Sequence, residues 1–458
     1  MARPSAPPND VTPAAARERA LTLLRRHGWN ATSFQILEPG FSYWFDGDDA
    51  AVAYLDTGAA WVAAGAPIAD PERAPAAALA FVAAAAARGR RACFFGTEDR
   101  FAAAVPFAAM RIGEQPAWDP AAWDEVLRGA RSLREQIRRA RAKGVEVRPF
   151  DPHLLAEPDG GPRAAVERLI ARWEAARPMP PMGFLVQMHL HSELEERRFF
   201  TAAQGDALVG FLSMVPVFAR RGWFVEDLVR LPEAPNGTAE LLVDAAMRAA
   251  AAEGSGYLTL GLAPLGGAVG PWLRIARRTG GPLYDFRGVH AFKAKLRPQA
   301  WAPIYISYPR PQLGVTTVYD ALAAFARGGL LRFGLRTLMR GPMMVVRLLA
   351  WLLVPWTVLL ASVDTRVWFP RPAIKWAWVS FDAVLALALG VLHRRWREGL
   401  ARAITFAIGA DAVLTLVEGV TWNAPRAATP GQWAVLVLAI AAPIAAFVTL
   451  WRAGMRGR

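Results

Sequence analysis

The sequence predicts an α/β region followed by a membrane region of four helices. Up to about Pro309, short apolar runs alternate with Ala-rich helical segments, and clusters of breaker residues separate them. After that point four apolar segments follow one another, each near the length that crosses a hydrocarbon core. A chain of 458 residues is long enough for two or three folding units of this kind.

The composition limits the class of partner and excludes disulfides. A formal charge of +14 predicts a polyanionic partner, either nucleic acid or anionic lipid, and charge alone does not choose between them. Cys93 is the single cysteine, so an internal disulfide is excluded, and its apolar surroundings predict a buried structural thiol. Residues 1–12 are polar and proline-rich and are expected to be disordered. They lack the apolar core of a secretory signal, which predicts a cytoplasmic first domain.

The segment 13–150 is predicted to be a first mixed α/β domain. Its turn clusters and apolar runs predict the following elements: a helix at 13–27, strands at 41–45, 50–55 and 60–64, a helix at 71–87, a strand at 92–95 and a helix at 98–105. The alternation of strands and helices predicts a central sheet that helices cover.

A strongly basic helix closes this first domain between Arg128 and Arg148. At helical spacing, Leu127, Ala130, Leu133 and Ile137 form an apolar stripe. The cations around that stripe that we take as candidate nucleic-acid contacts are Arg131, Arg134, Arg138, Arg139, Arg141 and Lys143. A solvated helix face is the alternative. Because the signs are so unbalanced that pairing within the helix cannot neutralise them, contact with a phosphate backbone is the preferred interpretation.

The segment 151–310 is predicted to be a second α/β domain. The expected elements are a helix at 163–176, a rigid loop at 178–184, strands at 198–203, 207–215, 222–230, 257–262 and 301–308, and a helix at 239–252. His189 and His191, two apart on an expected strand face, suggest the start of a metal site. Since no third ligand recurs at a recognisable spacing, two ordinary histidines are preferred, and no metal is expected. His290 is open to the same two interpretations, catalytic base or structural hydrogen bonder.

Ionisable groups gather where the strand at 222–230 ends. Glu226, Asp227 and Arg230 follow its apolar half, and folds of this class place ligands at the carboxyl ends of strands. A structural ion pair among these three side chains is the alternative. The sequence therefore predicts the candidate site at this strand tip.

The carboxyl-terminal third is predicted to hold the chain at a membrane. Residues 311–341 are expected to form an amphipathic basic segment, with a helix at 315–340 on the surface of an anionic leaflet. Residues 342–458 carry the four expected spans, at 343–362, 376–392, 400–420 and 433–451. Basic connections predict that the soluble part and the carboxyl terminus lie in the cytoplasm. Asp382, Asp411 and Glu418 fall within spans and are expected to face other helices, as interhelical polar contacts or as contacts to a lipid headgroup.

An ordered set of motifs from about Phe34 to Pro309 resembles the cytosolic catalytic domain of bacterial phosphatidylglycerol lysyltransferases, the multiple peptide resistance factor family. The motifs are Arg111-Ile112-Gly113-Glu114, the basic helix, Trp173, Gly183-Phe184, Asp227-Leu228-Val229-Arg230, Leu260-Gly261-Leu262-Ala263-Pro264-Leu265, and Phe292-Lys293-Ala294-Lys295 followed by Trp301 and Tyr305. Val229 stands where the family has Met. Family members with a flippase carry their membrane domain before the catalytic part, whereas here the spans come after it, so flipping of the product is not implied.

The resemblance implies two acetyltransferase-like domains in tandem and transfer of an aminoacyl group, lysyl or similar, from aminoacyl-tRNA to phosphatidylglycerol. It implies a bacterial inner-membrane enzyme without a cofactor, linked to antimicrobial peptide resistance. Its implied catalytic residues are Glu226, Asp227, Arg230 and Lys293, and its implied substrate-binding residues are Gly183, Phe184, Lys295 and Tyr305. The basic helix would then bind tRNA.

The transfer chemistry assigns possible roles to the charged residues. Asp227 or Glu226 would orient or deprotonate the lipid hydroxyl or hold the α-ammonium, and Arg230 would pair with Asp227 or clamp a phosphate. Lys293 and Lys295 diverge on a helix, so one of them, Lys293, is expected at a phosphate or oxyanion. Two alternatives remain: an acyl-CoA-dependent acyltransferase on the same fold, and a non-catalytic membrane-tethered binding module.

Overall fold

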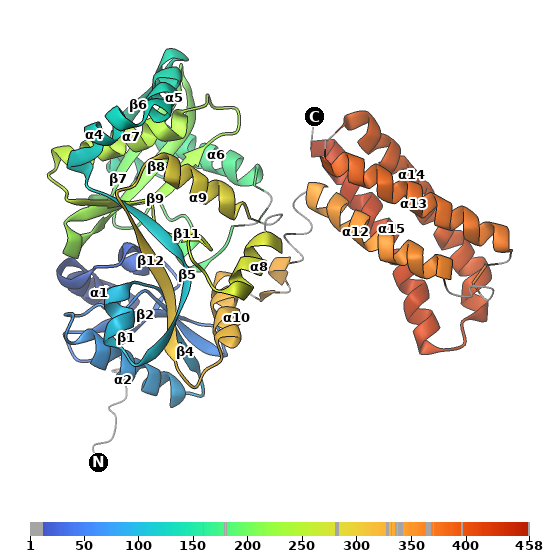
Figure 1. Ribbon diagram of the computed structural model, residues 1–458, viewed down its shortest axis with the longest axis horizontal. Coiled ribbons are helices and arrows are strands. Elements are labelled where there is room, and N and C mark those ends of the chain that lie inside the picture. The colour runs from blue at the N-terminus through green and yellow to red at the C-terminus, as the bar shows by residue number, and fades with distance from the viewer. Residues whose placement is uncertain are drawn as a thin grey trace. The chain divides into compact units, whose positions relative to one another are not determined.

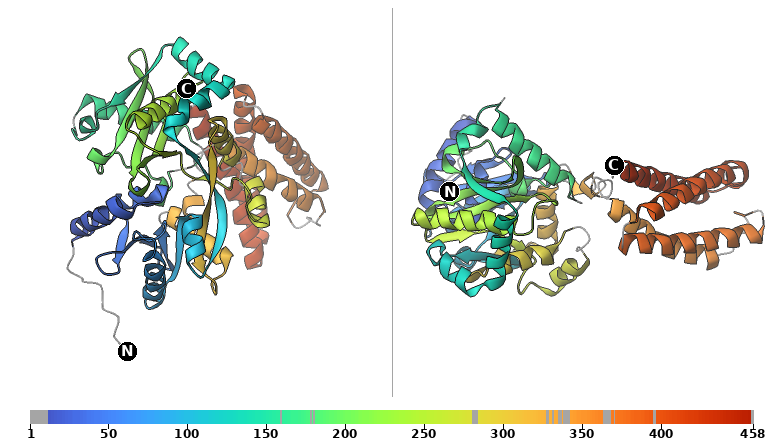
Figure 2. Two further views of the ribbon diagram at one scale, coloured as in Figure 1. Left: turned by 60° about the vertical axis from the view of Figure 1, so that its left-hand side comes forward. Right: turned by 90° about the horizontal axis from the view of Figure 1, so that it is seen from above.

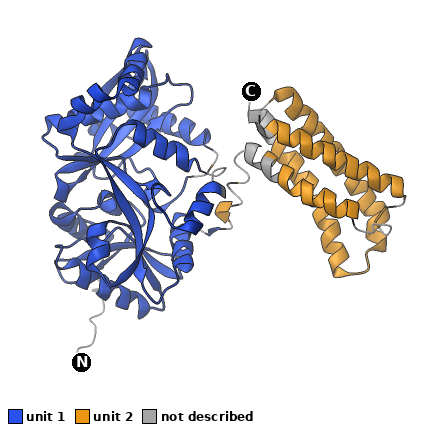
Figure 3. Ribbon diagram, in the orientation of Figure 1, with its two compact units in different colours: residues 1–177, 181–330 blue, residues 178–180, 331–458 orange. Residues whose placement is uncertain are grey.

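The computed structural model describes residues 12–456 except 159, 178, 180, 280–283, 327–328, 331, 335–336, 338–341, 363–367, 370 and 395–396. The chain forms two compact units, residues 1–177 with 181–330 (unit 1) and residues 178–180 with 331–458 (unit 2), as Figure 3 shows. Most of the segment expected to be disordered, residues 1–11, lies outside the described residues. Thr12 does not belong to it, because its side chain caps the first helix.

Unit 1 is built on one mixed sheet (Figure 1). In the described chain the strand order is β1-β2-β3-β4-β12-β5-β10-β9-β8-β7-β6, and β11 pairs with β5. The strands are β1 Ser42–Phe45, β2 Ala51–Asp56, β3 Ala60–Ala64, β4 Arg91–Thr97, β5 Phe107–Trp118, β6 Val145–Phe150, β7 Arg198–Gln204, β8 Ala207–Val217, β9 Gly222–Arg230, β10 Tyr257–Thr259, β11 Ala263–Pro264 and β12 Ala300–Pro309.

Helices lie against this sheet and connect its strands (Figures 1 and 2). The α-helices are α1 Pro13–His27, α2 Ala74–Ala86, α3 Asp99–Ala104, α4 Trp123–Gly129, α5 Arg131–Ala142, α6 Gly161–Ala175, α7 Thr238–Ala252, α8 Pro271–Thr279, α9 Phe286–Lys295 and α10 Gly314–Phe325. Short 3-10 helices are η1 Ala31–Leu37, η2 Pro120–Ala122, η3 Pro152–Leu155, η4 Phe184–Val186, η5 Leu194–Glu196 and η6 Phe218–Arg220.

The sheet contains two parallel strand pairs, and each needs a helical crossover. Strand β3 lies parallel to β4 and is joined to it through α2, and β9 lies parallel to β10 and is joined to it through α7. All other strand pairings that the structure describes are antiparallel. Because β12 and β5 separate β4 from β10, the two parallel pairs run in opposite directions, and their carboxyl ends open at opposite edges of the sheet.

The core explains why the basic helix is amphipathic. Leu127, Ala130, Leu133 and Ile137, the predicted apolar stripe, are all buried, and they belong to the cluster that also contains Phe199 and Phe211 of the sheet. Helix α5 packs on α7, as Figure 1 shows. Its arginines therefore stay on the outer face, which confirms the predicted stripe.

Most of the predicted elements are present, and the differences within unit 1 include the following two. The long central strand β5 was missed, because its buried positions do not alternate and it contains Gly113 and Pro116. Residues 187–191 form no strand, so His189 and His191 do not share a strand face. The 3-10 helices η4 and η5 lie before and after the two histidines.

Unit 2 is a helical bundle, with α12 Pro342–Ser362, α13 Pro372–Arg394, α14 Glu398–Glu418 and α15 Pro430–Arg456. One π-helical turn, η7 Gly419–Asn423, and a 3-10 turn, η8 Ala424–Arg426, follow α14. Among the described residues, three helices are long and apolar enough to cross a membrane: Pro372–Leu392, Glu398–Arg426 and Pro430–Trp451. The remaining expected span, 343–362, corresponds to α12. Within α12, the segment Leu349–Ser362 is apolar but shorter than a membrane span, and Pro355 lies inside it. The prediction of four spans is therefore reduced to three.

The acidic residues of the bundle make polar contacts. The indole of Trp378 on α13 donates to Glu418 on α14 at 3.1 Å, and Thr415 donates to Asp411 at 3.1 Å. Asp382 is buried. The contact between Trp378 and Glu418 confirms the expectation of a polar interhelical contact for Glu418.

The predicted single helix at 315–340 is wrong in its length. Helix α10 ends at Phe325, and Gly329 has a φ of +106°, a left-handed conformation that breaks a helix. Parts of the segment after α10, residues 327–328, 331, 335–336 and 338–341, lie outside the described residues.

Candidate active site

The candidate site lies where β9 and β10 part. Their parallel register ends at the pair Thr259 and Phe224, whereas β9 continues to Arg230. Gly261 turns the chain away from β9 with a φ of +68°, and a Cβ at this position would lie 2.6 Å from the ring of Phe224. The tip of β9 therefore lacks a strand partner on this side. Ligands in α/β folds bind at such carboxyl-end openings.

A β-bulge on β9 points two acidic side chains into one cluster. Ser213 of β8 pairs with Asp227 and Met214 pairs with Val225, so Glu226 is the extra residue. In a regular strand, successive side chains point to opposite faces, and a bulge removes this restriction. The hydroxyl of Ser213 donates to Asp227 Oδ2 at 2.8 Å and accepts the Asp227 backbone N–H at 3.1 Å. The bulge and Ser213 thus fix the carboxylate of Asp227 at the opening.

A fully buried arginine holds this cluster together. Arg197 donates through Nη1 to Glu226, through Nη2 to Glu38 at 3.0 Å, and through Nε to the carbonyl of Ser192 at 2.8 Å. Its guanidinium also lies 5.4 Å from the ring centre of Phe34. Glu226 consequently pairs with Arg197 rather than with Arg230, unlike in the alternative interpretation of an ion pair among Glu226, Asp227 and Arg230.

The cluster carries more acid than base. Three carboxyl groups, Glu38, Glu226 and Asp227, face one guanidinium, and Nε2 of His189 lies 3.8 Å from Glu38. Burial, and then the charge of Glu226, raises the pKa of Glu38 to about 9 and that of Asp227 to about 7. Among the described residues, Glu226 Oε1 has no hydrogen-bond donor although it is buried. Such a site favours a proton or a bound cation.

Asp227 meets the requirements for a general base. It is half-buried, and only one of its two oxygens accepts a hydrogen bond that the structure records within the described chain, from Ser213. A pKa of about 7 lets the carboxylate accept a proton near neutral pH and release it again. The sequence predicted the residue but not this pKa.

Lys293 holds the turn that opens the site. Its ammonium donates to the carbonyls of Leu260, Gly261 and Leu262 at 2.8, 2.9 and 2.8 Å, and it is buried. Burial lowers the pKa of Lys293 to about 7, whereas the three carbonyl acceptors favour the charged form. All three ammonium protons are used, so this arrangement leaves none for the expected phosphate or oxyanion. In this arrangement the Lys293 side chain supports the turn at 260–262.

The remaining candidate residues lie in separate environments. Lys295 points away from Lys293, as expected, and pairs with Glu240 at 2.5 Å and with Gln136. Arg230 makes one long hydrogen bond, 3.4 Å, to the side chain of Asn236. Tyr305 donates its hydroxyl to Asp99 at 2.7 Å. Of these three side chains, that of Arg230 makes the weakest contacts, and Arg230 follows Asp227 on the same strand.

Gly183 and Phe184 belong to an aromatic cluster. The N–H of Gly183 donates to the carbonyl of Phe325 at 2.8 Å, and Phe184 has a φ of +59°. The ring centre of Phe184 lies 5.7, 6.0 and 5.1 Å from those of Phe41, Phe95 and Phe325. These contacts fasten α10 to the loop before β7 and form an apolar wall.

The basic helix α5 presents its cations outward, but some are already paired. Arg138 and Arg139 both bond Glu135, which lowers the pKa of that carboxyl to about 2, and both remain well exposed. Arg141 pairs with Asp244 of α7 at 2.8 Å. Arg134 donates to the carbonyls of Leu127 and Arg128. Arg131 and Lys143 are exposed. A net positive face remains, as expected of a phosphate contact.

The other reactive side chains have local partners. His290 stacks on Trp301 with ring centres 4.7 Å apart and bonds Glu114 at 2.9 Å, as a structural hydrogen bonder does. His191 lies 3.3 Å from Glu167. Cys93 is buried, and burial raises the pKa of its thiol. Within the described residues, no three His, Cys, Asp or Glu side chains gather as metal ligands.

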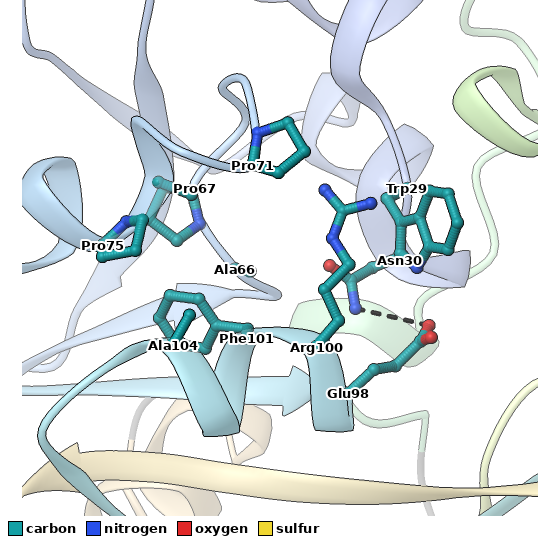
Figure 4. A pocket seen from close by; sticks show the side chains of 11 residues that line it. Trp29, Asn30, Ala66, Pro67, Pro71, Pro75, Glu98, Arg100, Phe101 and Ala104 are labelled. Atoms are coloured by element: carbon teal, nitrogen blue, oxygen red, sulfur yellow. Dashed lines mark hydrogen bonds between the residues drawn. The ribbon is translucent and has the colours of Figure 1, made fainter.

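A small cavity lies at the carboxyl end of the other parallel pair, β3 and β4 (Figure 4). It is lined by Trp29, Asn30, Ala66, Pro67, Pro71, Ala74, Pro75, Glu98, Arg100, Phe101 and Ala104. The guanidiniums of Arg100 and Arg220 lie 4.2 and 4.3 Å from the ring centre of Trp29. Since the two parallel pairs open at opposite edges of the sheet, this cavity is separate from the Asp227 site.

Sequence reasoning missed Arg197, Glu38 and Ser213. Arg197 stands in the charged run Glu195-Glu196-Arg197-Arg198, which is typical of an exposed turn, and its partner Glu38 is 159 positions away. Ser213 lies in an apolar strand, where a polar residue is the one available signal.

Comparison with known proteins identifies similar domains. The family model described as phosphatidylglycerol lysyltransferase, C-terminal, matches residues 21–308. The C-terminal domain of a putative lysylphosphatidylglycerol synthetase from Agrobacterium fabrum is 21% identical, with a TM-score of 0.59 over 70% of this chain and 99% of that chain. L-PGS from Bacillus licheniformis is 18% identical, with a TM-score of 0.57 over 67% of this chain and 96% of that chain.

A more distant structural neighbour is a GCN5-related N-acetyltransferase from Kribbella flavida, 14% identical, with a TM-score of 0.32 over 64% of this chain and 98% of that chain. No curated protein matches the sequence.

Proposed function

Because the chain belongs to the phosphatidylglycerol lysyltransferase C-terminal family, we propose that it transfers an aminoacyl group from aminoacyl-tRNA to phosphatidylglycerol or a related lipid headgroup. The observation that carries this proposal is the half-buried Asp227 at the opening between β9 and β10, with its pKa near 7 and its carboxylate fixed by Ser213. Asp227 would act as the base for a lipid hydroxyl, in a cluster that holds more carboxyl groups than cations.

The transfer needs one proton removal and one ester exchange. The lipid hydroxyl oxygen attacks the ester carbonyl carbon of the aminoacyl-tRNA and forms a new C–O bond, while its proton passes to Asp227. The bond from that carbon to the ribose oxygen then breaks, and the proton returns from Asp227 to the ribose oxygen. The chain ends the cycle in its starting protonation state, and no redox partner is needed.

The excess acid of the cluster serves substrate binding. An aminoacyl ester carries an α-ammonium. When Asp227 is ionised, the carboxylates of Glu226 and Asp227 outweigh the single Arg197 and create the negative potential that attracts the α-ammonium, whereas Glu38, with a pKa of about 9, adds little charge near neutral pH. A cation near Asp227 also lowers the pKa of its carboxyl and so favours the ionised base. Arg230 contacts a substrate phosphate, as a weakly engaged guanidinium can.

The two polyanionic substrates use two different parts of the chain. The outer face of α5, with Arg138 and Arg139 exposed, binds the tRNA backbone. The membrane-capable helices of unit 2 and the segment 311–341 keep the chain at a bacterial inner membrane with its catalytic part in the cytoplasm.

Lipid mass spectrometry of cells with and without the protein tests the proposal. An aminoacylated phosphatidylglycerol is expected only in cells that contain the wild-type chain. Asp227→Ala and Arg230→Ala are expected to abolish it while the protein still accumulates. Unchanged lipid in cells that contain either variant would refute the assigned role of that residue, and no new lipid with the wild-type chain would refute the function.

A further inference from the structure

Helix α8 presents an apolar face outward on unit 1. Trp272 and Ile275, three positions apart, lie on its outer face, and the Ile275 side chain is 61% exposed. Its inner face is fixed, because Leu273 is buried and Arg277 donates through Nη1 to the carbonyl of Leu265 at 3.0 Å. A tryptophan and an isoleucine are thus held outward on an anchored helix of nine residues.

The flank of this apolar face is cationic. Arg274 and Arg278, four positions apart, are both exposed on the same side of α8. The helix contains no Asp or Glu. Apolar side chains beside arginines, with a tryptophan among them, are typical of helices that lie in the interface of an anionic membrane.

Helix α10 presents a second apolar face. Val315, Tyr319 and Leu322 recur at intervals of four and three residues and are all exposed, Val315 at 72%. The opposite side of α10 is buried, where Asp320 pairs with Arg91 at 2.6 Å. The outward stripe is therefore fixed in position by an ion pair on the inner side.

The two faces lie next to each other. The loop before α8 bonds β5 through the Leu265 N–H and the Ile112 carbonyl at 2.7 Å, and Gly314 at the start of α10 lies against Met110 of the same strand. These two positions on β5 are about 7 Å apart at the rise of a strand. In Figure 1, α8 and α10 lie close together on the same side of unit 1.

We propose that this surface, Trp272, Arg274, Ile275 and Arg278 of α8 with Val315, Tyr319 and Leu322 of α10, docks on an anionic lipid leaflet. The chain itself argues for this occupant. Only residues 326–341 separate α10 from α12, a connection that spans at most about 60 Å when fully extended, and membrane-capable helices follow. The arginines supply the charge complementarity with lipid phosphates. Membrane contact through α8 is a property additional to the proposed transfer reaction and does not depend on it.

Site-directed spin labels on the full-length chain in lipid nanodiscs test the docking. Because Cys93 is buried, a label reacts with an introduced cysteine, and we choose Ile275→Cys and Tyr319→Cys. The control is Leu79→Cys on α2, another outward apolar side chain, 46% exposed and outside the proposed surface. Each label is compared for collision with oxygen, which concentrates in lipid, and with a water-soluble nickel complex.

In nanodiscs that contain phosphatidylglycerol, the labels at 275 and 319 are expected to collide more with oxygen and less with nickel than the label at 79. In the double variant Arg274→Glu, Arg278→Glu, the label at 275 is expected to collide with nickel and oxygen as often as the label at 79 does. Labels at 275 and 319 as aqueous as label 79 would overturn the proposal. Equal lipid contact in nanodiscs of phosphatidylcholine alone would overturn its anionic part. Because no turnover is measured, failure here is distinct from failure of the transfer reaction.

Discussion

Replacement of Asp227 by Asn is expected to remove activity and to raise stability. The unfolded aspartate ionises near its ordinary pKa of 3.8, whereas the folded one has a pKa of about 7. The folded chain therefore binds more protons than the unfolded chain between these values, and its stability falls as pH rises from about 4 to about 7. Above that range the full penalty applies. An amide at this position does not ionise and is free of the penalty.

The magnitude follows from the shift. A difference of about 3 units corresponds to about 4 kcal/mol at about 1.36 kcal/mol per unit, an upper limit. Because Asp227 is half-buried and part of its pKa shift comes from the charge of Glu226, we expect about 1–2 kcal/mol of gain in the free energy of unfolding at pH 8.5. The corresponding rise in the melting temperature of unit 1 is a few degrees. Loss of a general base lowers the transfer rate by about 10²–10⁴-fold.

The assay combines transfer with thermal unfolding of the full-length chain in nanodiscs at pH 5 and pH 8.5. The wild-type rate is expected to rise with pH through about 7, because the base acts when ionised. The control Asp206→Asn removes the same charge from the exposed turn between β7 and β8 and is expected to change neither rate nor stability. A variant at position 227 with wild-type turnover would refute the base, and one that is less stable at pH 8.5 would refute the electrostatic account.

Three further tests concern Arg197, Lys293 and the outer face of α5. Arg197→Met leaves Glu38 and Glu226 buried without their cation and is expected to lower the free energy of unfolding by about 3–5 kcal/mol. The control Arg198→Met, at the exposed neighbouring arginine, is expected to lower it by about 1 kcal/mol or less. Equal unfolding temperatures of the two variants would contradict this prediction. Lys293→Met deprives three carbonyls of their donor and is expected to lower the free energy of unfolding by about 3 kcal/mol, against about 1 kcal/mol for Lys295→Met. A larger loss for Lys295→Met would contradict the role of Lys293 in supporting the turn at 260–262. The double variant Arg138→Ala, Arg139→Ala is expected to weaken tRNA binding and to reduce the slope of log affinity against log salt concentration by about 2. An unchanged slope in filter-binding titrations would show that α5 does not contact tRNA.

Local patterns predicted the elements that frame the site. The strand at 222–230, the helix beginning at 238 and the strand at 300–309 were expected within one residue of their observed bounds, because breakers and apolar runs mark them. Position 257–262 was expected as one strand, but β10 ends at Thr259, since Gly261 turns the chain away. That early end creates the opening, and only packing against Phe224 reveals it.

The chemistry of the site could be predicted only in part. Asp227 and Arg230 were identified from their place at a strand tip, but the bulge at Glu226 and the pairing of Arg197 with Glu38 depend on contacts between distant segments. Lys293 was expected at a phosphate or oxyanion. Its three carbonyl partners follow from the fold of the 260–262 turn rather than from any local pattern. Periodicity reports which face is buried, and it does not report which charges meet.

We propose that the protein transfers an aminoacyl group from tRNA to a phospholipid at the opening beside Asp227. The most direct measurement incubates the purified full-length chain, in nanodiscs that contain phosphatidylglycerol, with aminoacyl-tRNA labelled in its amino acid. We predict that the label moves to the lipid fraction with the wild-type chain, that RNase treatment of the donor beforehand prevents it, and that Asp227→Asn does not support it. Label that stays on tRNA across the set of lysyl, alanyl and other aminoacyl donors, or transfer that the variant performs equally well, would contradict the claim.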